Sequence, residues 1–181
     1  MYKKSIVFLL FLIFILILPL IFSACSRSTG PTDKNILMDR TGNYETTASI
    51  TYKDLQATAQ ISRETPRSCS VMFTSPKSLA DMSFIFYEDA VDLAYKGLSF
   101  SFNPGSVPGG AAAKIAVELI NRSMRDDGVS VDYSAGILTL SGIMESGEFS
   151  LRLDRENGNL LTLSVPAEDL EIEFINFRFL D

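Results

Sequence analysis

The most reactive side chains in this sequence are its two cysteines, Cys25 and Cys69, and the sequence contains no histidine. Without histidine it lacks the general base of Ser-His-Asp and Cys-His catalysis and the commonest ligand of transition metals. Cys69 alternates with Val71 and Phe73, which predicts a thiol packed in a core rather than a nucleophile. No motif supports serine-lysine catalysis. We therefore predict no catalytic residue, no metal site and no cofactor, and the chain is not expected to be an enzyme.

Cys25 stands where a long apolar segment ends. Lys3 and Lys4, the apolar run Ile6–Phe22 and the small residues after it are typical of a secretory signal. The Ser23-Ala24-Cys25 sequence resembles the lipobox of bacterial lipoproteins, in which this cysteine is acylated and becomes the new N-terminus. The resemblance implies a lipid anchor, such as palmitate, in the bacterial cell membrane, with the folded part on the extracytoplasmic side. The alternative is an uncleaved transmembrane anchor, because the run is about as long as a membrane span; it leaves the folded part on the same side.

These features divide the chain into a signal peptide (residues 1–24), an acylated cysteine with a flexible tether (25–43) and a folded domain (44–181). Loss of Lys3 and Lys4 with the signal leaves 14 basic against 22 acidic residues, a net charge of −8. This balance argues against nucleic acid as a partner and against a domain that adheres to anionic lipid head groups. Cys69 is then the one cysteine left, so no internal disulfide is expected and the core must hold the domain together.

Most of the predicted domain alternates apolar and polar residues with the period of a β-strand. In its first half the alternation predicts strands at Ala57–Ile61, Val71–Phe73, Met82–Phe86, Val91–Tyr95 and Leu98–Phe102. The second half predicts a meander of three further strands, Val129–Tyr133, Ile137–Met144 and Phe149–Asp154, with turns marked by Gly136 and Gly147.

The next hairpin can be predicted from its register. A three-residue loop, Glu156-Asn157-Gly158, pairs Leu153 with Leu161, Leu151 with Leu163 and Phe149 with Val165. This keeps the apolar side chains on one face, and Gly158 supplies the left-handed residue that such a loop needs. The last strand, Leu170–Leu180, changes the parity of its apolar residues, which predicts a bulge or bend near Phe174.

One segment has the period of a helix rather than a strand. Residues Gly110–Asp127 carry an apolar stripe and a charged face, and Pro108 and Gly128 lie near the two ends, as expected for a helix. The stripe is Ala112, Ile115, Ala116, Leu119, Ile120 and Met124, and the charged face is Lys114, Glu118 and Arg122. We therefore expect a mainly β (α+β) fold, a strongly curved antiparallel sheet of about ten strands with one helix.

This order of elements resembles the exported carriers of lipoproteins and lipids of the LolA/LolB/LppX type. The resembling segments are Cys69–Leu79 leading into the Phe84–Tyr87 strand, the helix Ala111–Arg125, the glycine-marked meander and the terminal Phe174–Phe179 strand. The resemblance covers nearly all of the predicted domain and is one of layout. It implies an open half-barrel with the helix across its concave face and a lipid or lipoprotein as ligand.

Several polar motifs have plain structural explanations. The segment Gly105–Gly110 is read as a loop entering the helix, since no Gly-Lys-Ser/Thr follows it. Asp154, Asn157 and Asn159 could suggest calcium, but the hairpin accounts for all three. Glu171 and Glu173 alternate with apolar neighbours and are expected on the solvent face of a strand.

The remaining feature is an excess of apolar residues, including thirteen phenylalanines. These side chains could simply fill the core. Alternatively, one helix is too small to cover a strongly curved sheet, which predicts an apolar cavity for acyl chains. The predicted walls are Phe84, Phe86, Leu93, Tyr95, Phe100 and Phe102 on one side, Ile115 and Leu119 on the helix, and Leu138, Leu140, Phe149 and Leu151 on the other side.

Two functions fit this sequence. The first is a membrane-tethered lipoprotein that binds or shuttles a lipid or acyl chain in that cavity. The second is a non-enzymatic accessory lipoprotein that binds another envelope protein.

Overall fold

The computed structural model describes residues 42–65, 67–107, 111–123 and 129–180, which lie in one compact unit, Pro31–Asp181. The predicted signal peptide, the predicted lipid anchor at Cys25 and nearly all of the predicted tether lie outside the described residues. Before the helix the strands are β1 (Asn43–Tyr52), β2 (Leu55–Thr65), β3 (Ser68–Ser75), β4 (Ser83–Phe86), β5 (Val91–Tyr95) and β6 (Leu98–Phe102). After it they are β7 (Ser130–Ser134), β8 (Ile137–Met144), β9 (Gly147–Asp154), β10 (Leu160–Val165) and β11 (Leu170–Leu180).

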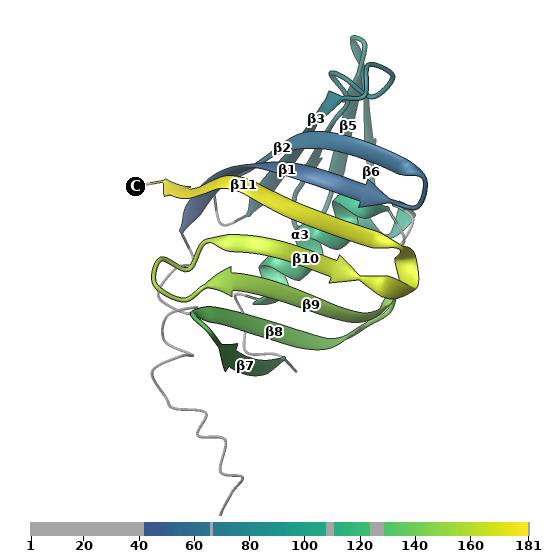
Figure 1. Ribbon diagram of the computed structural model, residues 1–181. Helices are drawn as coiled ribbons and strands as arrows, with labels where there is room; N and C mark the ends of the chain where they lie inside the picture. Colours follow the sequence, from purple (N-terminus) through teal and green to yellow (C-terminus); the bar gives the residue numbers. More distant parts are fainter. Residues whose placement is uncertain (1–41, 66, 108–110, 124–128, 181) are drawn as a thin grey trace, which may run out of the picture. The chain divides into compact units, whose positions relative to one another are not determined.

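The eleven strands form one antiparallel sheet in the order β6-β5-β4-β3-β2-β1-β11-β10-β9-β8-β7. Two meanders therefore meet in the middle, where β1 pairs with β11, and β6 and β7 form the two edges. Between these edge strands the chain passes through a short 3-10 helix, η1 (Pro104–Ser106), and the helix α3 (Ala112–Ser123). Figure 1 shows the sheet curving around α3. The prediction of a curved antiparallel sheet with one helix on its concave face is confirmed.

The core lies between the concave face of the sheet and α3. Alternate residues of each strand point inward, so that Ala48 and Ile50 of β1 and Leu163 of β10 are buried together with Ile115 and Leu119 of α3. Full burial of one such aliphatic side chain contributes roughly 1.5–3 kcal/mol. The apolar side chains of α3 therefore hold the helix against the sheet. Among the described residues, no helix is long and apolar enough to cross a membrane.

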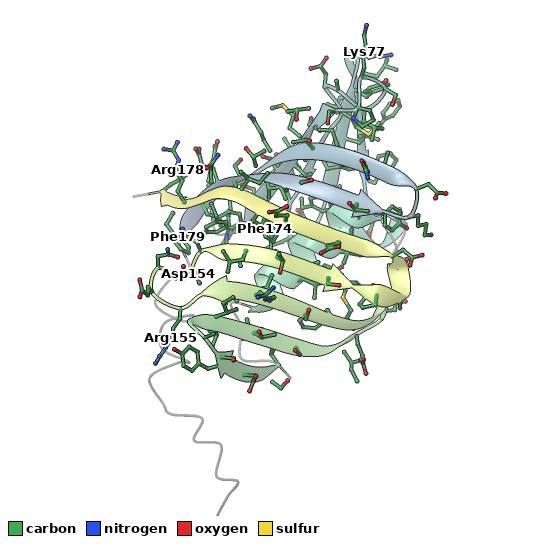
Figure 2. All side chains as sticks on the ribbon, viewed as in Figure 1. Lys77, Asp154, Arg155, Phe174, Arg178 and Phe179 are labelled. Carbon is green, nitrogen blue, oxygen red and sulfur yellow. The ribbon has the colours of Figure 1, made fainter. Side chains whose placement is uncertain are left out.

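The β9–β10 hairpin differs from its predicted register. The Asp154 N–H donates to the Asn159 carbonyl at 2.9 Å, so the loop holds the four residues 155–158 rather than three. The Asp154 carboxylate accepts hydrogen bonds from the Glu156 and Asn157 N–H groups, which stabilises the longer turn. Figure 2 shows Asp154 at this end of the sheet. Leu153 consequently pairs with Leu160 instead of Leu161.

A bulge then restores the expected pairing further along this hairpin. The register shifts between Leu160 and Thr162, so Leu161 is the extra residue. Leu163 therefore lies opposite Leu151, as predicted, and both are fully buried. Gly158 has a φ of 71°, which confirms the predicted left-handed residue.

In β11 the alternation of inward and outward side chains changes phase, as predicted, slightly beyond Phe174. Phe174 and Phe177 are both buried, Asn176 between them has a φ of 56°, and the pairing with β1 shifts between Glu45 and Thr47. Ile175 stays on the exposed face, contrary to the expectation that it joins Phe177. The buried Thr46 hydroxyl donates to the Ile175 carbonyl at 3.1 Å, which satisfies a backbone group that the bulge removes from the ladder.

Candidate functional site

The apolar side chains of β4, β5 and β6 lie on the same face of the sheet as the core. Cys69 and Val71 of β3, which are buried in the core, lie opposite Phe86 and Phe84 of β4. Residues directly opposite in an antiparallel pair project to the same side, and the register of β4 with β5 and of β5 with β6 extends this row to the sheet edge. We call these inward-facing side chains the β4–β6 face: Phe84, Phe86, Val91, Leu93, Tyr95, Leu98, Phe100 and Phe102.

Exposure of the β4–β6 face increases toward the edge of the sheet. Phe84 and Phe86 are half-buried against the core, with ring centroids 6.1 Å apart. On β6, Leu98 is 61% exposed, Phe100 50% and Phe102 38%. In the described part of the chain these β6 side chains lie outside the core that includes α3. The concave apolar surface thus continues from the core into solvent beyond the helix.

Tyr95 is fixed at the margin of the β4–β6 face. Its hydroxyl donates to the Ser78 carbonyl at 2.8 Å, and the Lys96 ammonium lies 4.9 Å from its ring centroid. This solvent-exposed hydrogen bond fixes the Tyr95 ring at the margin of the face, an arrangement suited to an amphipathic boundary.

A pocket of about 300 Å³ adjoins this face, between the sheet and α3. Its apolar lining is Cys69, Phe86, Val91, Pro104 and Val117, and its polar lining is Arg63, Arg67, Ser68, Tyr87, Glu88, Lys114, Glu118 and Asn121. Phe86 belongs to both the pocket and the β4–β6 face, so the two are contiguous. Together they form one amphipathic site.

The charged groups of the pocket lie at different depths. Arg63 is 9% exposed, and the side chain of Lys114 is 20% exposed. The Lys114 ammonium donates to the Val107 carbonyl at 3.2 Å and lies 3.9 Å from the Glu118 carboxylate. Glu118, Glu88 and Arg67 are all exposed. The two charges nearest the protein interior are therefore both positive.

Cys69 is a packed thiol, as predicted. Burial raises its pKa, which a hydrogen bond with Tyr44 and the positive charge of Arg63 offset only in part. Burial also raises the pKa of Tyr44 well above its usual value. The thiol therefore stays protonated at neutral pH and is not an activated nucleophile.

The predicted cavity walls fall into two groups. Phe84, Phe86, Leu93, Tyr95, Phe100 and Phe102 come together on the β4–β6 face and are at least partly exposed. The other six are buried in the core, at most 3% exposed: Ile115, Leu119, Leu138, Leu140, Phe149 and Leu151. These six side chains belong to the core cluster between α3 and the sheet. The candidate site is accordingly restricted to the first half of the sheet and its pocket.

Sequence reasoning missed the charged part of the pocket. Arg63 follows Ala59 and Ile61 on the inward-facing side of β2, so its position in an apolar alternation was the available signal. Lys114 was assigned to the solvated face of the helix, yet it lines the pocket. No periodic pattern connects these residues, because they come from distant segments.

The other polar motifs are structural. Asn157 accepts a hydrogen bond from the Asn159 N–H at 2.8 Å, so the suspected calcium ligands shape the turn. Glu171 and Glu173 are exposed on β11, as predicted. Within the described ranges, no group of three or more Cys, Asp or Glu residues is placed to hold a metal ion.

No protein-family model matches the sequence, and a comparison with curated proteins finds no match. Solved structures do resemble the chain. An uncharacterised conserved protein from Thermus thermophilus aligns over 83% of this chain and 87% of its own, with a TM-score of 0.54 and 12% identity.

Two further structures have lower TM-scores. The first is a chain from the structure of the CwlD amidase from Clostridioides difficile in complex with the GerS lipoprotein. The alignment covers 86% of this chain and 99% of that chain, with a TM-score of 0.49 and 12% identity. A LolA superfamily protein from Nitrosomonas europaea aligns over 82% and 94% (TM-score 0.38, 12% identity). At these identities the similarity is one of fold.

Proposed function

We propose that the chain is a membrane-tethered lipoprotein that binds an acyl chain on the β4–β6 face. The observation that carries the proposal is the contiguous row of apolar side chains that leaves the core and reaches solvent on the concave side of the sheet. Single exposed apolar residues are common on protein surfaces, whereas a contiguous exposed apolar patch marks an interaction or ligand-binding site. Each methylene buried there would contribute about 0.8 kcal/mol.

The N-terminal sequence supports the same proposal. An acylated Cys25 would keep the folded part at the membrane surface, where acyl chains are available. The acidic net charge disfavours adhesion of the whole domain to anionic lipids, so contact with lipid would be confined to the apolar site.

The second candidate is an accessory lipoprotein that binds another envelope protein. Its support is the position of β6 at the edge of the sheet, where a partner strand could pair with its backbone while covering Leu98 and Phe100. Both candidates use the same surface. They differ in what covers it.

Photo-crosslinking tests the first candidate. The full-length chain in lipid nanodiscs is exposed to a photoreactive palmitate analogue, and labelled peptides are mapped by mass spectrometry. We expect labels on β4, β5 and β6. Phe100→Gln should reduce labelling several-fold, because it places a polar amide on the face, without lowering the free energy of unfolding by more than about 1 kcal/mol.

Ile143→Gln is the matched control, since Ile143 is an exposed apolar residue on the outer face of β8. It should leave labelling unchanged. Equal labelling of wild type and Phe100→Gln would contradict acyl binding at this site. A stable protein complex lost in Phe100→Gln, with no acyl labelling of the wild type, would instead support the accessory role.

A further inference from the structure

The pocket beside the β4–β6 face carries a buried positive charge that acyl binding alone does not require. We propose that it binds the anionic head group, a carboxylate or a phosphate, of a single-chain lipid whose acyl chain lies on the β4–β6 face. This inference rests on the proposed function and specifies the class of lipid.

Arg63 provides the first argument. It continues the inward-facing series Ala59 and Ile61 on β2, where the two preceding inward side chains are apolar. A guanidinium at 9% exposure has lost most of its hydration, and its interaction with an anion is stronger there than at the surface. Its fixed fork of N–H donors matches the oxygens of a carboxylate or phosphate.

Lys114 provides the second argument. It lies in the first turn of α3, where a positive charge opposes the helix macrodipole. It also precedes Glu118 by four residues, which is the weaker order for a helical ion pair. The Lys114–Glu118 pair therefore contributes little to the stability of the helix. Its hydrogen bond to the Val107 carbonyl holds the ammonium at the pocket, on the side formed by α3.

The charge balance of the lining favours an anion. Three basic residues, Arg63, Arg67 and Lys114, face two acidic residues, Glu88 and Glu118, so the lining has a net charge of +1 in a chain of net charge −6. Both acidic side chains are exposed, where water and salt screen them, whereas Arg63 and Lys114 are largely shielded. The charges that line the pocket therefore favour an anion over a cation.

The volume of the pocket and its continuity with the β4–β6 face determine how a lipid fits. A pocket of about 300 Å³ is at the lower limit for a small-molecule site, so it accommodates a head group and the adjoining carbons rather than a whole lipid. Phe86 then leads from the pocket onto the open β4–β6 face. An amphiphile with one charged end and one acyl chain matches this arrangement.

Competition against the photoreactive palmitate analogue tests the inference on the full-length chain in nanodiscs. The competitors are palmitate, hexadecanol and a lysophosphatidic acid with the same acyl chain. We expect palmitate or the lysophosphatidic acid to compete at about tenfold lower concentration than hexadecanol, the effect of one charge-assisted hydrogen bond. Whichever anion competes better identifies the head group.

Two variants locate the effect. Arg63→Met and Lys114→Met each remove one positive charge and keep a long apolar side chain, and each should reduce the preference for the anion several-fold. If Arg63→Met fails to fold, Lys114→Met alone still tests the head-group site. Lys77→Met is the control, since Lys77 is exposed at the tip of the β3–β4 connection in Figure 2 and should change nothing.

The outcomes separate this inference from the proposed function. Equal competition by all three compounds would overturn the head-group site while leaving acyl binding intact. A preference for the anion that survives in Lys114→Met and in folded Arg63→Met would also overturn it. Failure of every competitor, together with unlabelled wild type, would overturn both proposals.

Discussion

The hydroxyl of Tyr44 and the sulfur of Cys69 lie 3.5 Å apart, and both groups are buried. They come from β1 and β3, on either side of β2, and Cys69 also lines the pocket. Their contact joins the packed core to the candidate site. Because burial raises the pKa of both groups, each is held in its neutral form.

This burial predicts a dependence of stability on pH. The pKa of Cys69 is higher in the folded than in the unfolded state, so its contribution is complete below the unfolded value, about 8.5, and is lost as the pH rises toward the folded value. Urea denaturation of a fragment of residues 26–181 should give a lower free energy of unfolding at pH 9.5 than at pH 7.5. In Cys69→Ala this decrease should be smaller, and an equal decrease in both proteins would contradict the prediction.

Gly158→Val should destabilise the fold by about 1 kcal/mol or more. Gly158 has a φ of 71° and its N–H donates to the Asp154 carbonyl, whereas a β-branched residue resists the left-handed region. The midpoint of urea denaturation measures the change. Glu156→Val in the same exposed loop is the control and should alter the midpoint little. Equal midpoints for Gly158→Val and the wild type would mean that the loop tolerates the substitution by changing its conformation.

Leu119→Gln and Leu163→Gln should lower the free energy of unfolding by similar amounts, about 3 kcal/mol each. Leu119 on α3 and Leu163 on β10 are both fully buried, and each substitution leaves a polar amide in the core. Thermal and urea denaturation of the two variants provide the comparison. A much smaller loss for Leu119→Gln, accompanied by reduced acyl labelling, would indicate that this face of α3 contacts ligand instead.

Cys25→Ser should release the chain from membranes or leave its precursor unprocessed. The prediction rests on the Ser23-Ala24-Cys25 sequence, since serine cannot accept the thioether-linked lipid. Membrane fractionation and metabolic labelling with a palmitate analogue measure it. Ser26→Ala is the matched control and should be processed like the wild type. Membrane retention of Cys25→Ser at the same size as the wild type, with no palmitate label on either protein, would favour the uncleaved anchor.

Period-two alternation was sufficient to predict most strands, and the helical period was sufficient to predict α3, because one buried face determines the register of each element. Alternation failed where local hydrogen bonds compete with that pattern. The Asp154 carboxylate lengthens its turn by one residue, and Asn176 takes up a left-handed conformation that keeps Ile175 outward. Such choices depend on contacts made by single side chains, which periodicity does not record.

The candidate site was predictable only in part. The apolar side of the β4–β6 strands follows from alternation, but alternation does not say which inward side chains a helix covers. Leu138 and Phe100 have the same pattern in sequence, yet the first is buried beside α3 and the second is half exposed at the edge strand. The charged lining depends on β2, β4 and α3 meeting at one place, which is a property of the folded sheet.

The central position of β1 has a mechanical consequence. β1 begins at Asn43 and is hydrogen-bonded on both sides, to β2 and to β11. A force applied through the chain that precedes Asn43 therefore pulls along an inner strand and loads both ladders at once, in shear. In an antiparallel ladder the bonds lie across the direction of pulling, so they resist together instead of opening one after another. Tension from this end therefore acts first on the middle of the sheet, away from the edge strands β6 and β7.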